Sequence, residues 1–291
     1  MSGLWRLGTS AGIRLARGGP GEGPTQLLAP DVTIDELLGD GAATLADLDR
    51  LPVSGPVPEE HSVLAPVASQ EIWAAGVTYM RSRDARMEES TNPDHYDRVY
   101  DATRPEVFYK AAGWRARGPG QTLGIRRDSV WDVPEPELGV VADAGGSIVG
   151  YVLGNDMSSR SIEGENPLYL PQAKAYDHSC GLGPCLVPVD FAPPREDMVI
   201  QLLVDRGGTQ IFSEEVSVRD LRRTPEELVD WLFSAVAFPV GAILLTGTAM
   251  VPPGDFTLEE EDRVSISMPG LGRLANPVER VGRVIPEVSD R

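Results

Sequence analysis

The chain has 291 residues, of which 41% are hydrophobic and 24% charged, a composition that is typical of a folded globular protein and not of a disordered one. Its formal net charge is -18, and so acidic a surface repels phosphate backbones and anionic lipid, which argues against nucleic acid and membrane partners. The 31 Gly and 25 Pro residues predict many short strands joined by turns.

The first 65 residues are expected to form a small N-terminal domain, followed by a larger domain over residues 66–291. No apolar segment follows a basic start, which argues against a secretory signal and favours the cytoplasm; three Arg and no acid among the first 17 residues leave a transit peptide as the alternative. Alternation and capping signals predict, in chain order, a strand pair, two helices and an acidic, Pro-rich linker: Leu4–Leu7 with Ile13–Arg17, Thr33–Leu38, Ala43–Leu51 (capped by Thr44 or Asp47) and Pro52–Glu60.

The next informative element is a predicted hairpin that carries three carboxylates. Glu135 and Glu137 are two positions apart, so in a strand both side chains point to the same face. If Ala144-Gly145 centre a two-residue turn, Glu135 lies opposite Gly154. Asp156 then shares the face of the glutamates, one diagonal from Glu135, whereas a turn longer by one residue would reverse its direction.

Carboxylates gathered on one face repel each other unless a cation lies between them, so this hairpin predicts a metal site. Carboxylate oxygens are hard ligands, which suit Mg²⁺, Mn²⁺ or Ca²⁺. The chain has only three His, so a His-based zinc or iron site is poorly supported. The alternative interpretation is that both glutamates are ordinary solvated strand residues, because two acids separated by one residue form a common pattern.

Lysine is scarce in this chain. Of the 26 cationic residues only Lys110 and Lys174 are lysines, and Arg supplies the rest of the positive charge. Lysine can lose its proton and act as a base, whereas Arg cannot, so the two retained amines are candidates for function. Compositional bias and chance are the alternative explanation, which is weaker for Lys174 than for Lys110.

Two features of the C-terminal half are interpreted as structural. Cys180 and Cys185 are too few for a disulfide framework or a zinc site, so both are expected to be buried or inert thiols. Trp231–Gly254 contains no charged residue and is long enough to suggest a membrane span. Capping and turn signals predict instead a helix, a turn and a core strand: 225–237, Pro239–Gly241 and Ala242–Thr246.

Short motifs between Gly76 and Thr248 resemble the fumarylacetoacetate hydrolase superfamily in their order and approximate spacing. They are GVTY at 76–79, PEVFYK at 105–110, GPG at 118–120, EPELG at 135–139, GNDMSSR at 154–160, Lys174, GP at 183–184 and TGT at 246–248. The resemblance implies an α+β, mainly β fold: a mixed β-sandwich roll that is catalytic, behind a small N-terminal domain. It also implies a Mg²⁺ or Mn²⁺ site formed by Glu135, Glu137 and Asp156.

The departures from the family pattern indicate which reaction to expect. Hydrolytic and decarboxylating relatives carry a motif resembling GxNYxxHxxE, and its His and Glu positions are Ser82 and Ala85 here. The water-activating pair of the hydrolases is therefore missing, and Glu163 replaces the usual Gln. The stretches 82–86 and 165–174 look like the sugar-acid branch, the 2-keto-3-deoxy-pentonate dehydratases of the 2-dehydro-3-deoxy-D-arabinonate type.

That branch implies a hydro-lyase that forms 2,5-dioxopentanoate in a non-phosphorylating pentose oxidation pathway. The metal would hold the carboxylate and keto oxygens of the 2-keto acid and stabilise negative charge after C3 loses a proton. We expect Lys174 to be the C3 base or a proton shuttle and Glu163 the acid for the C4 hydroxyl. Substrate contacts are expected from Arg160, Thr248, Ser82, Arg83 and Tyr79.

Two alternatives to the dehydratase are open. The first is a metal-dependent hydrolase of acylpyruvates or diketo-3-deoxy sugar acids on the same fold, against which Ser82 and Ala85 argue. The second is a non-catalytic protein that binds a keto acid or a metal, against which the retained Lys174 and the two glutamates argue. The family forms dimers and tetramers, so a homodimer or homotetramer is expected.

Overall fold

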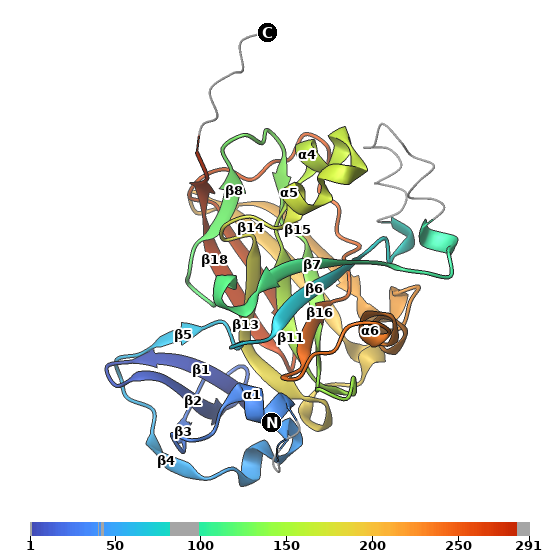
Figure 1. Cartoon of the computed structure of the whole chain (residues 1–291). Coiled ribbons are helices and arrows are strands. Elements are labelled where there is room, and N and C mark those ends of the chain that lie inside the picture. Colours follow the sequence, from blue (N-terminus) through green and yellow to red (C-terminus); the bar gives the residue numbers. More distant parts are fainter. Residues whose placement is uncertain (1, 40, 42–43, 82–98, 284–291) are drawn as a thin grey trace.

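The computed structural model of the chain describes residues 2–39, 41, 44–81 and 99–283. Strands dominate these residues and the helices are short, which confirms the expected mainly β fold (Figure 1). The larger sheet has eleven strands in a mixed arrangement. Its order is β4 (Val53–Pro56), β3 (Gln26–Leu28), β2 (Gly12–Gly18), β1 (Gly3–Thr9), β13 (Cys180–Pro188), β11 (Ile148–Asp156), β10 (Pro136–Ala142), β16 (Ala242–Leu245), β6 (Glu71–Gly76) and β7 (Glu106–Ala112), with β5 (Ser62–Leu64) paired to β1.

A second sheet of five strands packs against the middle of the larger one. Its order is β15 (Thr209–Ser217), β14 (Val199–Arg206), β17 (Arg263–Met268), β18 (Gly272–Val281) and β8 (Leu123–Arg126). β14 follows the two-residue period of a half-buried strand, because Ile200 and Leu202 face the core while Gln201 between them is exposed. The two-residue strands β9 (Asp132–Val133) and β12 (Ser158–Ser159) pair with each other beside the sandwich.

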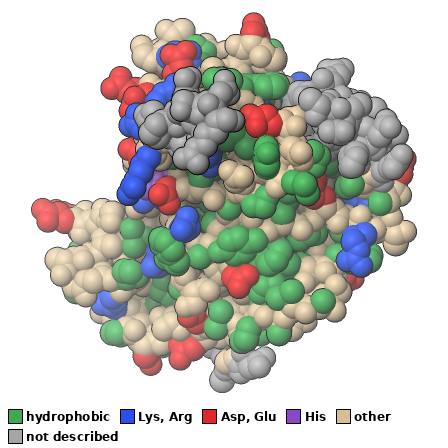
Figure 2. Space-filling model, turned by 45° about the horizontal axis from the view of Figure 1, so that its top comes forward, with side chains coloured by type: hydrophobic (Ala, Val, Ile, Leu, Met, Phe, Trp, Pro, Cys, Tyr) green, Lys and Arg blue, Asp and Glu red, His purple; other side chains and the backbone are tan. Residues whose placement is uncertain are grey.

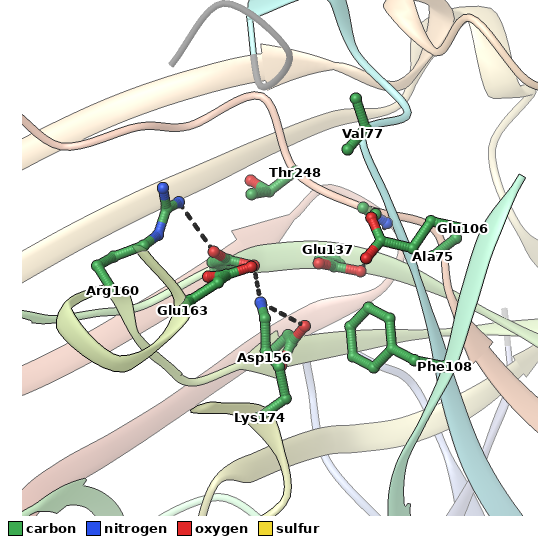
Figure 3. Close-up of a pocket in the computed structure, with 13 residues that line it drawn as sticks. Ala75, Val77, Glu106, Phe108, Glu137, Asp156, Arg160, Glu163, Lys174 and Thr248 are labelled. Carbon is green, nitrogen blue, oxygen red and sulfur yellow. Dashed lines mark hydrogen bonds and ion pairs between the residues drawn. The ribbon is translucent and has the colours of Figure 1, made fainter. Parts of the chain in front are cut away.

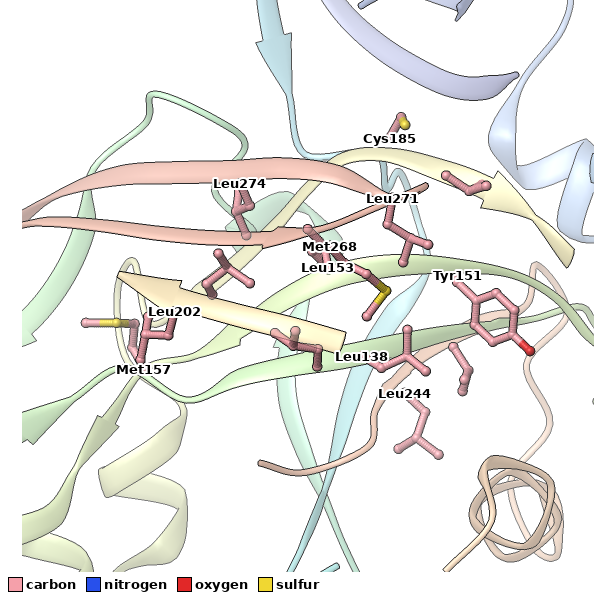
Figure 4. Packing of buried hydrophobic residues seen from close by; sticks show 14 of the residues in the cluster. Leu138, Tyr151, Leu153, Met157, Cys185, Leu202, Leu244, Met268, Leu271 and Leu274 are labelled. Atoms are coloured by element: carbon pink, nitrogen blue, oxygen red, sulfur yellow. The ribbon is translucent and has the colours of Figure 1, made fainter. Parts of the chain in front are cut away.

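The central strands β10, β11 and β16 are buried on both faces, which explains their nearly continuous apolar sequences. On one face Leu138, Leu153 and Leu244 meet residues of the second sheet such as Leu202 and Leu274 (Figure 4). On the other face a separate apolar cluster joins the sheet to the N-terminal residues. Each fully buried Leu contributes about 1.5–3 kcal/mol, so the central strands, and the hairpin they contain, are held from both sides.

The N-terminal region follows the predicted order with two corrections. The strand pair is present as β1 and β2, and the first helix is α1 (Ile34–Leu38), capped by Thr33. The second is a 3₁₀ helix, η1 (Leu45–Arg50), since the Asp47 amide donates to the Thr44 carbonyl three residues earlier, and its capping box between the same two residues fixes its start two residues after Ala43. The predicted linker Pro52–Glu60 is wrong in its first half, since Val53–Pro56 pairs with β3 as β4. β1 also pairs with β13, so the sheet is continuous into the larger domain, and the boundary at residue 65 stays a prediction.

The uncharged C-terminal stretch forms a helix, a turn and a strand, as predicted. Helix α6 (Pro225–Phe233) begins at its Thr224 cap but ends four residues before the predicted residue 237. It ends early because the backbone and hydroxyl of Ser234 both donate to the carbonyl of Trp231, which satisfies a terminal acceptor. Strand β16 follows after the turn. Among the described residues, no helix is both long and apolar enough to cross a membrane.

The other helices whose bounds lie within the described residues are short and lie between strands. They are η2 (Gly113–Arg115), α4 (Arg160–Glu165), η3 (Pro167–Tyr169), α5 (Leu170–Lys174), η4 (Val189–Phe191), η5 (Arg195–Asp197) and η6 (Val218–Asp220). The consecutive helices α4, η3 and α5 contact one another beside β12 and β7. They bring the insertion-like residues 165–174 next to the end of the β10–β11 hairpin.

The β10–β11 hairpin has a different register from the predicted one. The backbone amide of Asp156 donates to the carbonyl of Glu135 at 2.9 Å, so the two residues lie directly opposite each other and not on a diagonal. One residue of the shift comes from the loop, which closes by a bond from the Asp143 amide to the Ser147 carbonyl. A second comes from a β-bulge at Val149. Two one-residue shifts preserve the side-chain direction, so Asp156 still shares the face of the glutamates.

Candidate active site

The three predicted ligand carboxylates converge at the end of the β10–β11 hairpin. Glu135 precedes β10, Glu137 lies in it, and Asp156 ends β11. All three side chains are buried, with exposed fractions of 3%, 1% and 1%. One oxygen from each lies within 4.8 Å of the others, so a single ion could contact all three. They line a cavity of about 20 Å³, which has room for one ion or water molecule (Figure 3).

The Lys174 ammonium contacts two of these carboxylates. The residue ends helix α5, and its Nζ lies 2.6 Å from Glu135 Oε2, 3.0 Å from Asp156 Oδ2 and 2.5 Å from the Ser158 hydroxyl. These contacts occupy all three protons of an ammonium group. The side chain is 2% exposed, so the contacts exclude solvent. The amine that the composition indicated as a candidate thus lies against two of the three carboxylates.

Helix α4 supplies Arg160 and Glu163. Ser159 caps the helix by accepting from the Ile162 amide, and the three-residue spacing puts both functional side chains on one side of it. Arg160 Nη2 lies 2.9 Å from Glu135 Oε1, on the opposite carboxylate oxygen from Lys174. Both residues are buried and line the cavity.

Strand β7 supplies the opposite wall, whose Glu106 and Phe108 were not among the predicted site residues. Glu106 and Phe108 are two residues apart on one face of the strand and line the cavity, and Lys110 follows at a β-bulge. In Figure 3, Glu106 and Phe108 lie on the other side of the carboxylates from Arg160 and Glu163. The alternation within PEVFYK was the signal available in the sequence. It could have placed Glu106 on the same face as Phe108, in the segment that ends with the candidate Lys110.

Lys110 is buried and contacts the carboxylate cluster, although it does not line the cavity. Its Nζ lies 2.5 Å from Asp156 Oδ1, 3.0 Å from the carbonyl of Met157 and 2.5 Å from the carbonyl of Lys174. The two oxygens of Asp156 therefore each contact a different lysine. The scarcity of lysine marked this residue, but sequence alone could not show that it contacts a candidate metal ligand.

The charge distribution fits a cation beside Glu137. Glu135 and Asp156 have ion pairs with Lys174, Arg160 or Lys110, whereas within the described residues Glu137 has none and accepts only from the Gly247 amide at 2.6 Å. Burial raises the pKa of Glu137 well above its ordinary value, and the charges of Asp156 and Glu135 raise it further. A divalent ion would remove this repulsion, and an all-carboxylate donor set suits Mg²⁺.

Of the other predicted substrate contacts, one lines the cavity, one does not, and two lie outside the described residues. Thr248 lines the cavity and follows Gly247, whose φ of 91° and close approach to Thr78 require glycine. Tyr79 is buried and is not among the lining residues. Ser82, Arg83 and Ala85 lie outside the described residues. The structure therefore brings together Thr248, the α4 and α5 residues and the carboxylates, but not Tyr79.

The cysteines are free and buried, as predicted. Cys180 lies opposite Asp156 in the β11–β13 pair, so it is close to the site. Burial raises the pKa of the Cys180 thiol to about 12, and it also raises that of Cys185. Neither thiol is therefore ionised near neutral pH, and neither is suited to be a nucleophile or a soft metal ligand.

The sequence is similar to a known protein family and to individual enzymes. Residues 94–279 match the family model described as fumarylacetoacetate (FAA) hydrolase C-terminal. A probable 2-keto-3-deoxyxylonate dehydratase of Haloferax volcanii is 51% identical over 217 residues, 74% of each chain. A 2-dehydro-3-deoxy-D-arabinonate dehydratase of Saccharolobus solfataricus is 40% identical over 222 residues, 75% of this chain and 74% of its own.

The fold is also similar to solved structures over almost its whole length. A structure of 2-keto-3-deoxy-D-arabinonate dehydratase complexed with magnesium and 2,5-dioxopentanoate superposes with a TM-score of 0.82 at 31% identity. The match covers 97% of this chain and all of that one. It therefore includes the N-terminal strands as well as the sandwich.

Proposed function

The chain belongs to the fumarylacetoacetate hydrolase family, and from that premise we propose that it is a metal-dependent dehydratase acting on a 2-keto-3-deoxy-pentonate. Its product is 2,5-dioxopentanoate, the α-ketoglutarate semialdehyde of a non-phosphorylating pentose oxidation pathway. The observation that carries this proposal is the buried triad Glu135, Glu137 and Asp156 with Lys174 against it. Two relatives with dehydratase names, at 51% and 40% identity, support the choice of reaction.

The cavity residues can bind a small 2-keto acid. A bound Mg²⁺ supplies Lewis-acid polarisation of the 2-keto group, which makes the C3 protons more acidic. Arg160 adds positive charge that offsets the substrate carboxylate. The Thr248 hydroxyl accepts from the Met250 amide, which leaves its proton for a substrate oxygen. These contacts hold the carboxylate end of the substrate at the carboxylate cluster.

The hydroxyl end of the substrate has room beside the cluster. Glu106 and Glu163 line both the small cavity and a neighbouring one of about 320 Å³, to which Arg104 and Leu170 also contribute. Carbons 4 and 5 would extend between the two glutamates into this space. The reaction removes one water, as a proton from C3 and the hydroxyl from C4, and tautomerisation then converts the C5 alcohol carbon into the aldehyde. Lys174 removes the C3 proton, as the base or as a proton shuttle. Glu163 is the acid that protonates the C4 hydroxyl as it leaves.

If Glu163 is the acid, a substrate that needs no acid should restore the activity of Glu163→Gln. Glu163→Gln should lower kcat by about 10²–10⁴-fold, because an amide cannot give up a proton to the leaving hydroxyl. A substrate with fluorine in place of the C4 hydroxyl has a leaving group that needs no proton, so Glu163→Gln should turn it over at close to the wild-type rate. Glu106→Gln is the matched control on the other wall. Rescue of Glu106→Gln instead of Glu163→Gln would transfer the acid role to Glu106.

The reaction itself is tested by incubating the purified protein with 2-keto-3-deoxy-pentonates of D-arabino and L-arabino configuration. We expect 2,5-dioxopentanoate to form with Mg²⁺, to stop with chelator and to resume when Mg²⁺ is restored. A coupled NAD-dependent aldehyde dehydrogenase reports the product. Rapid carbon–carbon cleavage of an acylpyruvate without dehydration would favour a hydrolase. Tight binding without turnover would favour a non-catalytic binder.

We also propose that the enzyme works in the cytoplasm as a homodimer or homotetramer. Two free, buried thiols are compatible with a reducing compartment. Large apolar side chains are exposed, including Trp114 at 77%, Val130 at 84% and Leu168 at 83%. Figure 2 shows apolar side chains gathered across the middle of one face, with charged ones around them. Contact between copies of the chain would cover such surface.

A further inference from the structure

The Lys110 ammonium joins three segments that are far apart in the sequence. It reaches from strand β7 to the carboxylate of Asp156, to the carbonyl of Met157 and to the carbonyl of Lys174, which ends helix α5. The hydrogen bonds span 47 and 64 residues of chain. The side chain has no exposed area, so no water replaces any of these contacts. One group therefore fixes both a carboxylate of the triad and the end of the helix that carries the proposed base.

These contacts suit an ammonium and not a guanidinium. One nitrogen donates hydrogen bonds to two carbonyls and forms an ion pair with a carboxylate oxygen, whereas a guanidinium presents its donors in a flat fork that needs more space. The chain uses Arg for almost all its positive charge and yet has Lys at this buried position. Loss of the ammonium would leave Asp156 Oδ1 buried without its ion pair to Lys110, and the carbonyls of Met157 and Lys174 would each lose a donor.

We propose that Lys110 is a positioning residue for the metal site and for the base. It holds Asp156 by Oδ1 so that the carboxylate plane stays turned toward Glu135 and Glu137, and it holds the end of α5 so that the Lys174 ammonium reaches the same cluster. The inference rests on the metal requirement of the proposed function. It concerns a residue that does not line the cavity and that takes no part in the reaction itself.

A positioning role and a purely electrostatic role of Lys110 predict opposite changes in metal affinity. If Lys110 acted only through its charge, Lys110→Met would remove repulsion of a dication and tighten metal binding. If Lys110 positions Asp156, the same change weakens binding. We expect the dissociation constant for Mn²⁺, measured by electron paramagnetic resonance without substrate, to rise by about 10–100-fold, the usual effect of losing a residue that orients a ligand. In the dehydration assay kcat should fall more than KM changes.

A second variant and a matched control complete the experiment. Lys110→Arg keeps a positive charge next to Asp156, so it avoids the uncompensated buried carboxylate of Lys110→Met, but it should weaken Mn²⁺ binding in the same direction. Arg223 is the control, because it is another buried cation that contacts carbonyls and a carboxylate, those of Val99, Ala102 and Glu227. Arg223→Met should lower the melting temperature and leave the Mn²⁺ dissociation constant within about twofold of wild type.

The Mn²⁺ binding measurements test the positioning role of Lys110, and the dehydration assay tests the proposed function. Unchanged or tighter Mn²⁺ binding in Lys110→Met, or unchanged binding in Lys110→Arg, would overturn the positioning role. Equal weakening in Arg223→Met would also overturn it, since the effect would then reflect general loss of stability. If the wild type binds Mn²⁺ and dehydrates no keto acid, the proposed function fails, while the binding measurements on Lys110 still decide the inference.

Discussion

Replacing Lys174 with methionine is expected to lower kcat by about 10²–10⁴-fold while the protein remains folded and binds its metal. The loss follows because methionine fills the same space but can neither accept nor carry the C3 proton. Metal binding should become tighter, because Lys174 Nζ lies 2.6 Å and 3.0 Å from oxygens of Glu135 and Asp156 that a dication would otherwise share. The loss of kcat is measured in the dehydration assay, and the change in metal affinity is measured by Mn²⁺ titration of the same preparation.

The control for Lys174 is arginine at the same position. Lys174→Arg keeps a positive charge beside the two carboxylates and removes the exchangeable amine, so it too should be inactive. Near-normal turnover by Lys174→Met with the metal bound would show that the base lies elsewhere. The sign of the change in metal affinity, tighter for Lys174→Met and weaker for Lys110→Met, distinguishes the two lysines on one carboxylate.

Glu137→Gln is expected to stabilise the metal-free protein and to abolish its response to Mg²⁺. Glutamine still accepts from the Gly247 amide, but it removes a buried charge that Asp156 and Glu135 repel. In wild type, saturation at about 100 times the dissociation constant should add about 2.7 kcal/mol to the free energy of unfolding. Glu137→Gln should lose this gain and all dehydration. Thermal melts with chelator and with Mg²⁺ measure both.

The pH dependence of the same melts has a definite sign. Because the pKa of Glu137 is raised on folding, the folded metal-free protein binds a proton more tightly than the unfolded chain. Stability is therefore lost as pH rises above the ordinary value of 4.5, and the advantage of Glu137→Gln should shrink in acid. Glu163→Gln is the control: it removes another buried carboxylate but should keep the Mg²⁺ response. A full Mg²⁺ response in Glu137→Gln would exclude Glu137 as a ligand.

The sequence predicted the face of each carboxylate but not the register between them. Two-residue spacing put Glu135 and Glu137 together, and this depends only on strand geometry. The partner of Glu135 depended on the loop length and on a bulge at Val149, and neither has a strong local signal. The two shifts of one residue add up to a two-residue error in the pairing, but together they preserve the direction of the side chains, so the predicted cluster still contained Asp156.

Long-range contacts were the part that sequence reasoning could not supply. The scarcity of lysine identified Lys110 and Lys174, but their meeting at Asp156 depends on how β7 and α5 pack around the hairpin. Glu106 was missed because the alternation within PEVFYK shows that it shares a face with Phe108, but not that this face borders the carboxylates. In the N-terminal region, Val53–Pro56 contains Gly and Pro and resembles a linker, and only pairing with β3 makes it a strand.

The carboxylates of the triad all come from one hairpin, whereas both ammonium groups come from other parts of the chain. During folding the hairpin can form from nearby residues, at little cost in loop closure, before β7 and α5 have docked. At that stage it gathers three like charges without the lysines that later contact them. A divalent ion present in solution can neutralise the hairpin at this point. The ion would then assist folding as well as catalysis, and a chain made in its absence would depend on the arrival of Lys110 and Lys174 to bury the same charges.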